Sequence, residues 1–153
     1  MYNNFQKDAD ELQALIMEDA KKVYSEKVIE RWLNPKNLGR IRNPEGFAKI
    51  KGPCGDTMQI SFKVKDHKIS KMRFRTDGCA SSIAAGSMAT ELAMGKTIEE
   101  AVKISPQMIL DALDGLPEES VHCALLASNT LKEAIKNYKH TQRDHLDPQG
   151  KEE

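Results

Sequence analysis

Apolar residues recur at every third or fourth position, or at multiples of that spacing, over the first part of the chain. They are Leu12, Leu15, Ile16, Val23, Ile29 and Trp32. Neither glycine nor proline interrupts this stretch, so the pattern predicts a helix from Asp8 to Leu33. The dipeptide Asn34-Pro35 ends it, because the residue before a proline is pushed away from helical backbone angles. The following residues, up to Gly46, are rich in Asn, Gly and Pro and predict a loop.

The period then shortens to two, which indicates strands. A first short strand is predicted from Phe47 to Lys51. Apolar and polar residues alternate from Met58 to Val64 and again from Met72 to Thr76, with the turn residues Asp66-His67-Lys68 between them. These two segments therefore predict an antiparallel hairpin. Ile69 falls out of phase with Met72, which indicates a β-bulge or a late start of the strand.

A helical period returns at Ala80 and continues to Met94, where Gly95 provides a C-terminal cap. Thr97 and then Ser105-Pro106 are start signals for two short helices, predicted to end near residues 103 and 115. The last helix is predicted to begin near residue 120. Its apolar stripe consists of Leu131, Ala134, Ile135 and Tyr138. Strands followed by helices predict an α+β fold, with a small three-stranded antiparallel sheet and helices packed on one face.

Length and charge limit the classes of function. A chain of 153 residues is the size of one domain. Its 23 basic and 23 acidic residues cancel, and only 5% of the residues are aromatic, so the composition argues against a nucleic-acid partner. The N-terminus is polar and no apolar run reaches the length of a membrane span. We therefore expect a cytoplasmic protein with no membrane attachment.

The three cysteines carry the candidate chemistry. An odd number of cysteines in a reducing compartment favours a metal site or reactive thiols over a disulfide framework. Together with one imidazole and one carboxylate nearby in the sequence, they form a ligand set that suits zinc or iron–sulfur chemistry. The set is Cys54, Asp56, Cys79, His122 and Cys123. The alternatives are small buried cysteines, and an Asp56 that only bonds the backbone of its own turn.

Each cysteine lies where the chain changes direction. Cys54 is flanked by Pro53 and Gly55 in a turn before a predicted strand, with room for a metal or a sulfide. Cys79 begins a predicted helix, whose free amides and dipole are expected to lower the thiol pKa. Cys123 begins the last helix, so we expect a similar benefit there. His122 precedes it, and because neighbours on a helix point about 100° apart, both reach one metal only at a helix end.

Several segments together resemble the IscU/NifU-type iron–sulfur cluster scaffold family, whose members are similar to the NifU N-terminal domain. The matching segments are Tyr24–Ile29, Asn34–Gly39, Cys-Gly-Asp at 54–56, Gly-Cys-Ala-Ser-Ser at 78–82 and His-Cys-Ala-Leu-Leu-Ala at 122–127. The order and spacing of these motifs agree with the family over about three quarters of the chain. The resemblance implies a SufE/NifU-like α+β domain at residues 24–139. Residues 1–23 form an additional helical extension before it, and the polar composition of residues 140–153 predicts a disordered tail.

The resemblance also implies a function without turnover. A pyridoxal-phosphate cysteine desulfurase would deliver sulfur as a persulfide to Cys123, and iron or electron donor proteins would supply the rest. A transient cluster, of the two-iron–two-sulfur type, would be held by Cys54, Cys79 and Cys123, with His122 or Asp56 completing the site. Apo-iron–sulfur proteins would then receive the cluster. An oxygen or imidazole ligand among thiolates would keep the cluster labile.

The chain also departs from the family. Leu116-Pro117-Glu118-Glu119-Ser120-Val121 replaces the family's chaperone-binding Leu-Pro-Pro-Val-Lys, which puts help from a dedicated Hsp70-type chaperone in doubt. The alternative function is a zinc-dependent sulfurtransferase resembling SufU, and zinc is the alternative occupant of the cluster-free form. That branch carries a basic residue in place of His122 and an insertion that is not evident here, so we favour the scaffold. A structural zinc domain fits less well, because no Cys-x-x-Cys pair is present.

Overall fold

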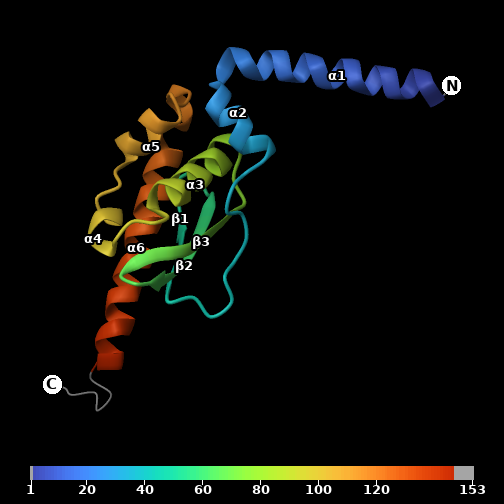
Figure 1. Cartoon of the computed structure of the whole chain (residues 1–153). Coiled ribbons are helices and arrows are strands. Elements are labelled where there is room, and N and C mark those ends of the chain that lie inside the picture. Colours follow the sequence, from blue (N-terminus) through green and yellow to red (C-terminus); the bar gives the residue numbers. More distant parts are fainter. Residues whose placement is uncertain (1, 147–153) are drawn as a thin grey trace.

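A computed structural model describes residues 2–146 of the chain (Figure 1). The elements follow one another as helices, a sheet and then helices again. They are α1 (Tyr2–Val23), α2 (Glu26–Leu33), β1 (Gly46–Lys51), β2 (Thr57–Lys65), β3 (Lys68–Thr76), α3 (Ala80–Ala93), α4 (Ile98–Ala101), α5 (Pro106–Ala112), the 3₁₀ turn η1 (Glu118–Ser120) and α6 (His122–Leu146).

The three strands form one antiparallel sheet in the order β1-β2-β3. The predicted bulge is present, because Lys63 pairs with Lys71 whereas the next residue, Val64, pairs with Ile69. α3 packs against β3, and α6 packs against β1 and β2. Figure 1 shows these two long helices crossing the same side of the sheet. The structure thus confirms the predicted α+β fold with its three-stranded sheet.

The core lies between the sheet and α3 with α6. Its fully buried strand residues are Met58, Ile60, Phe62, Ile69, Met72 and Phe74. α3 meets them with small residues, and a Cβ added to Gly86 would lie only 2.6 Å from Cε2 of Phe74. This close approach holds α3 against the sheet, so that its first turn lies near the end of β3.

The helix predicted from Asp8 to Leu33 is in fact two helices. α1 begins earlier and ends at Val23, and α2 begins after Ser25. The Ser25 hydroxyl accepts a hydrogen bond from the Val28 amide at 3.1 Å and donates one to the Leu113 carbonyl. A serine side chain that bonds the backbone in this way favours a helix start over a helix interior. Apolar spacing alone did not reveal the break, because the period continues through it.

At the other end of the chain, α6 continues to Leu146, so the tail predicted from residue 140 begins too early. Between His140 and Leu146 no glycine or proline stops the helix, and the Thr141 hydroxyl bonds the Asn137 carbonyl at 3.0 Å. Residues 147–153 of the predicted tail lie outside the described residues. Within residues 2–146, no helix is long and apolar enough to cross a membrane.

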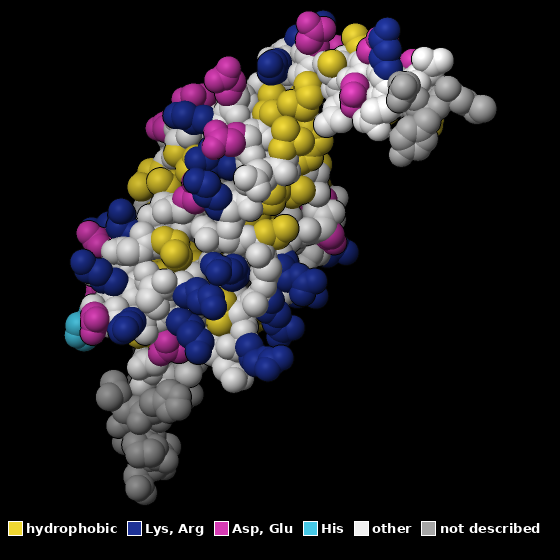
Figure 2. Space-filling model, turned by 45° about the vertical axis from the view of Figure 1, so that its right-hand side comes forward, with side chains coloured by type: hydrophobic (Ala, Val, Ile, Leu, Met, Phe, Trp, Pro, Cys, Tyr) yellow, Lys and Arg dark blue, Asp and Glu magenta, His cyan; other side chains and the backbone are white. Residues whose placement is uncertain are grey.

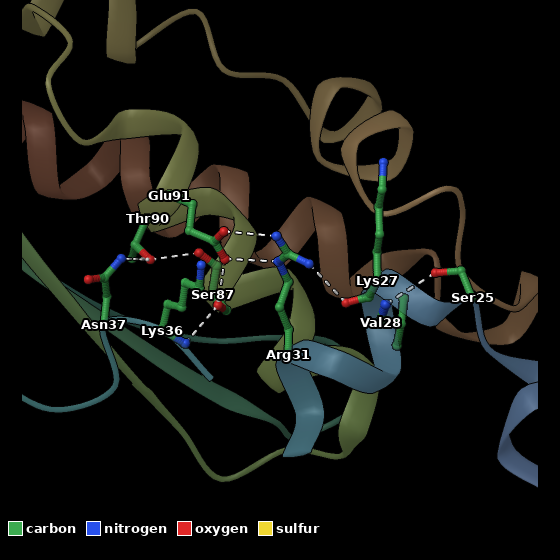
Figure 3. A network of polar contacts seen from close by, with 9 residues as sticks. All are labelled: Ser25, Lys27, Val28, Arg31, Lys36, Asn37, Ser87, Thr90 and Glu91. Atoms are coloured by element: carbon green, nitrogen blue, oxygen red, sulfur yellow. Dashed lines mark hydrogen bonds and ion pairs between the residues drawn. The ribbon is translucent and has the colours of Figure 1, made fainter. Parts of the chain in front are cut away.

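A network of polar contacts fastens α2 and the following loop to α3 (Figure 3). Arg31 of α2 binds Glu91 of α3 through two nitrogens, each 2.9 Å from a carboxylate oxygen. Ser87 donates to the same carboxylate at 2.8 Å and accepts from the Lys36 amide at 3.1 Å. The loop and both helices are therefore joined by side chains on a partly buried surface.

Candidate metal and sulfur site

Three separate segments meet at one end of the sheet. The turn before β2 carries Asp56, the start of α3 carries Cys79, and the start of α6 carries His122 and Cys123. One ligand atom from each of Asp56, His122 and Cys123 lies within 4.8 Å of the others. The structure therefore brings three of the predicted ligands to within reach of a single metal ion. His122 and Cys123 share this position because they are the first two residues of α6.

Ser82 links two of these ligands, although it was not among the predicted site residues. Its hydroxyl donates to Oδ2 of Asp56 at 3.0 Å and lies 3.3 Å from Sγ of Cys123. The side chain is fully buried. A signal was present in the sequence, because Ser82 follows Cys79 by three residues and the two therefore lie on one side of a helix.

Gly78 is the second residue that sequence reasoning missed as part of the site. A Cβ at this position would lie 2.7 Å from Oδ2 of Asp56 and would overlap Oγ of Ser82. Only a residue without a side chain leaves this hydrogen bond undisturbed. The motif around Cys79 does not by itself indicate this constraint, because Asp56 approaches from a distant part of the chain.

Cys54 is placed differently from the other two cysteines. It lies in an exposed turn closed by hydrogen bonds from the Gly52 amide to the Asp56 carbonyl at 2.7 Å and from the Gly55 amide to the Gly52 carbonyl at 3.0 Å. Gly55 has a φ of 92°, which favours glycine. Among the described residues, no hydrogen bond joins the Cys54 thiol to the other ligands, and the close ligand group does not include it. The turn instead holds its neighbour Asp56 in the site.

Cys79 is exposed and caps the N-terminus of α3. Partial burial acts to raise its pKa, but the Ser82 and Ser81 amides and the Ser82 hydroxyl outweigh this effect. The net pKa of Cys79 therefore lies below the ordinary value, as the sequence analysis predicted from the helix start. The Asp56 carboxylate opposes this shift weakly, which places Cys79 within its electrostatic reach.

Cys123 contradicts the prediction of a lowered thiol pKa at the start of the last helix. Its side chain is only 1% exposed and belongs to the hydrophobic core. Burial raises its pKa to about 11, the Ser82 hydroxyl opposes the rise, and the nearby Cys79 and Asp56 add to it. Desolvation of the thiolate thus outweighs the helix dipole. The His122 Nε2 atom lies 3.7 Å from its sulfur.

The site borders a strongly basic surface. The three strands contain eight basic residues and no acidic one: Lys49, Lys51, Lys63, Lys65, Lys68, Lys71, Arg73 and Arg75. Figure 2 shows basic side chains gathered over the lower part of the domain. A hollow of about 280 Å³ lies between Lys49 and Arg75 and extends to Thr57 and Asp77, next to the site. The positive charges are therefore concentrated on the strands, although the net charge of the whole chain is zero.

Comparisons with known proteins agree with the order of motifs and elements. The model of the family described as NifU-like N terminal domain matches residues 23–145. An iron-sulfur cluster assembly scaffold protein of Archaeoglobus fulgidus, IscU 1, is 48% identical over 117 residues, which cover 76% of each chain. The scaffold protein IscU of Escherichia coli K12 is 41% identical over 121 residues, covering 76% of this chain and 94% of its own.

The fold has solved counterparts as well. The crystal structure of a NifU-like protein (N-terminal) from Brucella abortus matches with a TM-score of 0.61 over 77% of this chain and 95% of its own. The sequence identity is 18%, so this likeness concerns the fold alone.

Proposed function

Because this chain belongs to the family of NifU-like N-terminal domains, we propose that it is a scaffold for the assembly of iron–sulfur clusters. The observation that carries this proposal is the close group of a carboxylate, an imidazole and a thiol from Asp56, His122 and Cys123. An exposed second thiol, Cys79, adjoins that group. Thiolates with one imidazole suit iron and zinc far better than magnesium or calcium. The relatives named as scaffold proteins support the same function.

The cluster is the cargo of this site rather than a resident cofactor, and we assign it the two-iron–two-sulfur type. Cys79 and Cys123 supply thiolates, and His122 or Asp56 supplies a weaker ligand that allows the cluster to leave. Cys54 adds the third thiolate from its exposed, glycine-flanked turn, which must close over the site to do so. Apo-iron–sulfur proteins then receive the cluster, with no turnover by the scaffold itself.

Sulfur enters by transfer from a cysteine desulfurase, and Cys123 is the proposed acceptor. Its thiolate attacks the outer sulfur of the desulfurase persulfide, a new S–S bond forms, and the desulfurase thiolate leaves. Because Cys123 is buried, the start of α6 must open first. Cys79 is the second candidate, favoured by its exposure and lowered pKa.

Mass spectrometry separates the two acceptors. The protein is incubated with a cysteine desulfurase and free cysteine, and persulfide is measured in wild type, Cys79→Ser and Cys123→Ser. We expect persulfide to be lost in Cys123→Ser and kept in Cys79→Ser. The reverse result would move the acceptor role to Cys79.

Anaerobic reconstitution with iron and sulfide tests the scaffold function. We expect wild type to become coloured and to lose its visible absorbance with time, and Asp56→Ala to hold its colour longer, because a route for ligand exchange is gone. His122→Ala, measured beside them, shows which weaker ligand sets the lifetime. Colourless protein in all three, with about one zinc per chain in wild type, would overturn the proposal. That outcome would favour the zinc-dependent sulfurtransferase.

A further inference from the structure

We infer that Ser82 is a positioning residue that holds Asp56 and Cys123 at metal-binding separation before the metal arrives. The inference rests on the proposed function, since it gives Ser82 a task in the same site. Ser82 comes from α3, whereas Asp56 lies 26 residues before it and Cys123 lies 41 residues after it. One hydroxyl therefore contacts two ligands that come from segments far apart in the sequence.

The Ser82 hydroxyl contacts both ligands, and its hydrogen bond to Asp56 has a defined direction. A serine hydroxyl has a single proton, and here it is donated to Oδ2 of Asp56. Oγ of Ser82 also lies 3.3 Å from Sγ of Cys123, within hydrogen-bond distance of this second ligand. Both future ligands are thus oriented by a neutral group that does not itself compete strongly for a metal ion. Partners of this kind, which orient metal ligands without binding the metal, typically change metal affinity by about 10–100-fold when removed.

The chain offers a matched control one residue away. Ser81 is also fully buried in the first turn of α3, but its hydroxyl has no hydrogen-bond partner among the described residues. Ser81→Ala therefore removes the same atom at the same depth without breaking a contact to a ligand. Gly78→Ala is the opposite probe, because its added Cβ would disturb the Ser82–Asp56 hydrogen bond while every polar group remains.

Cobalt(II) titration of the metal-free, reduced full-length chain under anaerobic conditions tests the inference. Cobalt reports its ligands through its visible absorption and its thiolate charge-transfer bands. We expect Ser82→Ala and Gly78→Ala to bind cobalt about tenfold more weakly or worse. Ser82→Thr, which keeps the hydroxyl, should recover most of the affinity, and Ser81→Ala should match wild type. Thermal unfolding of each variant shows whether a loss of affinity merely follows a loss of stability.

The outcomes separate Ser82 from the site itself. If Ser82→Ala binds cobalt within twofold of wild type, or if Ser81→Ala weakens binding equally, the positioning role is wrong and the proposed function stands. If wild type shows no thiolate charge-transfer band with cobalt, the metal site fails, and the inference about Ser82 fails with it.

A second, independent inference concerns α1, which projects from the domain in Figure 1. Its large apolar side chains are between 50% and 74% exposed: Phe5, Leu12, Leu15, Ile16 and Val23. Their three-to-four spacing places them along one side of the helix. Most of the stability of a helix in a protein comes from packing of its apolar side. We propose that α1 packs antiparallel against α1 of a second copy of this chain.

The sequence of α1 is complementary to itself in that arrangement. In an antiparallel pair centred between Leu12 and Ile16, these two residues face each other across the pair, and Phe5 faces Val23 of the second copy. Asp8 then lies beside Lys22 of the second copy, and the two-fold axis repeats this ion pair. Such flanking charges set orientation more than affinity.

Other occupants of this face fit less well. The helix carries five acidic residues against three lysines, which does not suit an anionic membrane surface: Asp8, Asp10, Glu11, Glu18 and Asp19 against Lys7, Lys21 and Lys22. Asp19 lies within the apolar stripe and faces the small Ala9 in the antiparallel pair, and its carboxylate is 3.6 Å from Nζ of Lys22 in its own helix. Lys22 would therefore lie between Asp19 of its own helix and Asp8 of the second copy.

Sedimentation equilibrium of the full chain over micromolar concentrations tests the pairing. We expect a dimer in wild type, monomers in Leu12→Glu, a weaker dimer in Asp8→Lys, and recovery in the double variant Asp8→Lys/Lys22→Asp. Met108→Glu is the control, because Met108 is an exposed apolar residue on α5. A monomeric wild type, a dimer that survives Leu12→Glu, or binding of α1 to anionic lipid vesicles would overturn the proposal.

Discussion

Cys79 and Cys123 both lie at the start of a long helix and border the same site, yet their thiol pKa values are shifted in opposite directions. Cys79 is exposed, and the amides of α3 bring its pKa below the ordinary value. Cys123 is buried in the core, and its pKa is raised to about 11. A helix start is therefore not sufficient to activate a thiol. The outcome depends on whether the sulfur faces the free amides in contact with water or packs beneath them.

The comparison divides the site into a thiol that is ready to react and one that is protected. Cys79 is the N-cap of α3, so its sulfur lies beside the unpaired amides of the first turn, and those of Ser81 and Ser82 lower its pKa. Cys123 is the second residue of α6 and its side chain turns inward among core residues. The same fold thus keeps one thiolate available and stores the other as a thiol until metal or sulfur arrives.

Alkylation rates should show the largest difference. At pH 8, a thiol with a pKa near 11 has a thiolate fraction about a hundredfold smaller than an ordinary thiol, and Cys79 is ionised at least as far as an ordinary thiol. The more basic Cys123 thiolate is more nucleophilic, which raises its alkylation rate about tenfold. Burial of the sulfur restricts access of the reagent and offsets this gain. We expect iodoacetamide to modify Cys79 on the order of a hundredfold faster than Cys123, measured by peptide mass spectrometry on metal-free protein. Equal rates would show that the two environments do not differ in solution.

Stability at alkaline pH should show the next largest effect. The folded protein keeps the Cys123 proton up to a pKa of about 11, whereas the unfolded thiol loses it near 9.0, so unfolding releases a proton between these values. The contribution of Cys123 to the free energy of unfolding is therefore fully present below pH 9 and falls by about 2 kcal/mol as pH rises toward 11.

Urea unfolding of wild type and Cys123→Ala from pH 8 to 11 measures this difference. The variant should lose less stability over the same range. Tyr138, whose pKa is also raised by burial, is common to both proteins and cancels in the comparison. Parallel pH profiles of the two proteins would mean that Cys123 is not protected in the folded state.

His122 should have the smallest effect on the metal-free protein. Its Nε2 atom lies 3.7 Å from the Cys123 sulfur, but burial, Ser82, Cys79 and Asp56 determine the Cys123 pKa. We expect His122→Ala to change the alkylation rate of Cys123 less than about threefold. A larger change would show that His122 activates this thiol and that the two cysteines differ less than the structure indicates.

Local chemistry explains which parts of the fold could be predicted. The alternation of apolar and polar residues predicted the strands, and the position of Ile69 out of step with Met72 indicated the bulge. Thr97 and Ser105 cap the two short helices that they were expected to start. These features depend on neighbours in the sequence. The break at Ser25 could not be predicted in this way, because the apolar period runs through it and the Leu113 carbonyl that receives its hydroxyl lies 88 residues away.

The candidate site shows the same limit. Residue types and turns were enough to select Asp56, His122 and Cys123, which the fold brings together. The direction of the Cys123 pKa and the place of Ser82 depend on which side of α6 and α3 faces the core. That is decided by packing between segments 26 and 41 residues apart, which no local pattern records.

The polar network between α2 and α3 has a consequence for how the protein opens. Because Arg31, Glu91, Ser87 and the Lys36 amide bridge α2, the loop and α3, these segments cannot separate one at a time without breaking partly buried hydrogen bonds. Amide hydrogen exchange should therefore protect α2 and α3 as one cooperative unit, with similar opening free energies. Among the residues that the structure describes, no side chain of α1 makes such a bond to the domain, so in the isolated monomer its amides should exchange orders of magnitude faster. The first-turn amides of α3 beside Cys79 lie outside this network and have no partner within the helix, so they should exchange faster than the half of α3 that carries Ser87 and Glu91.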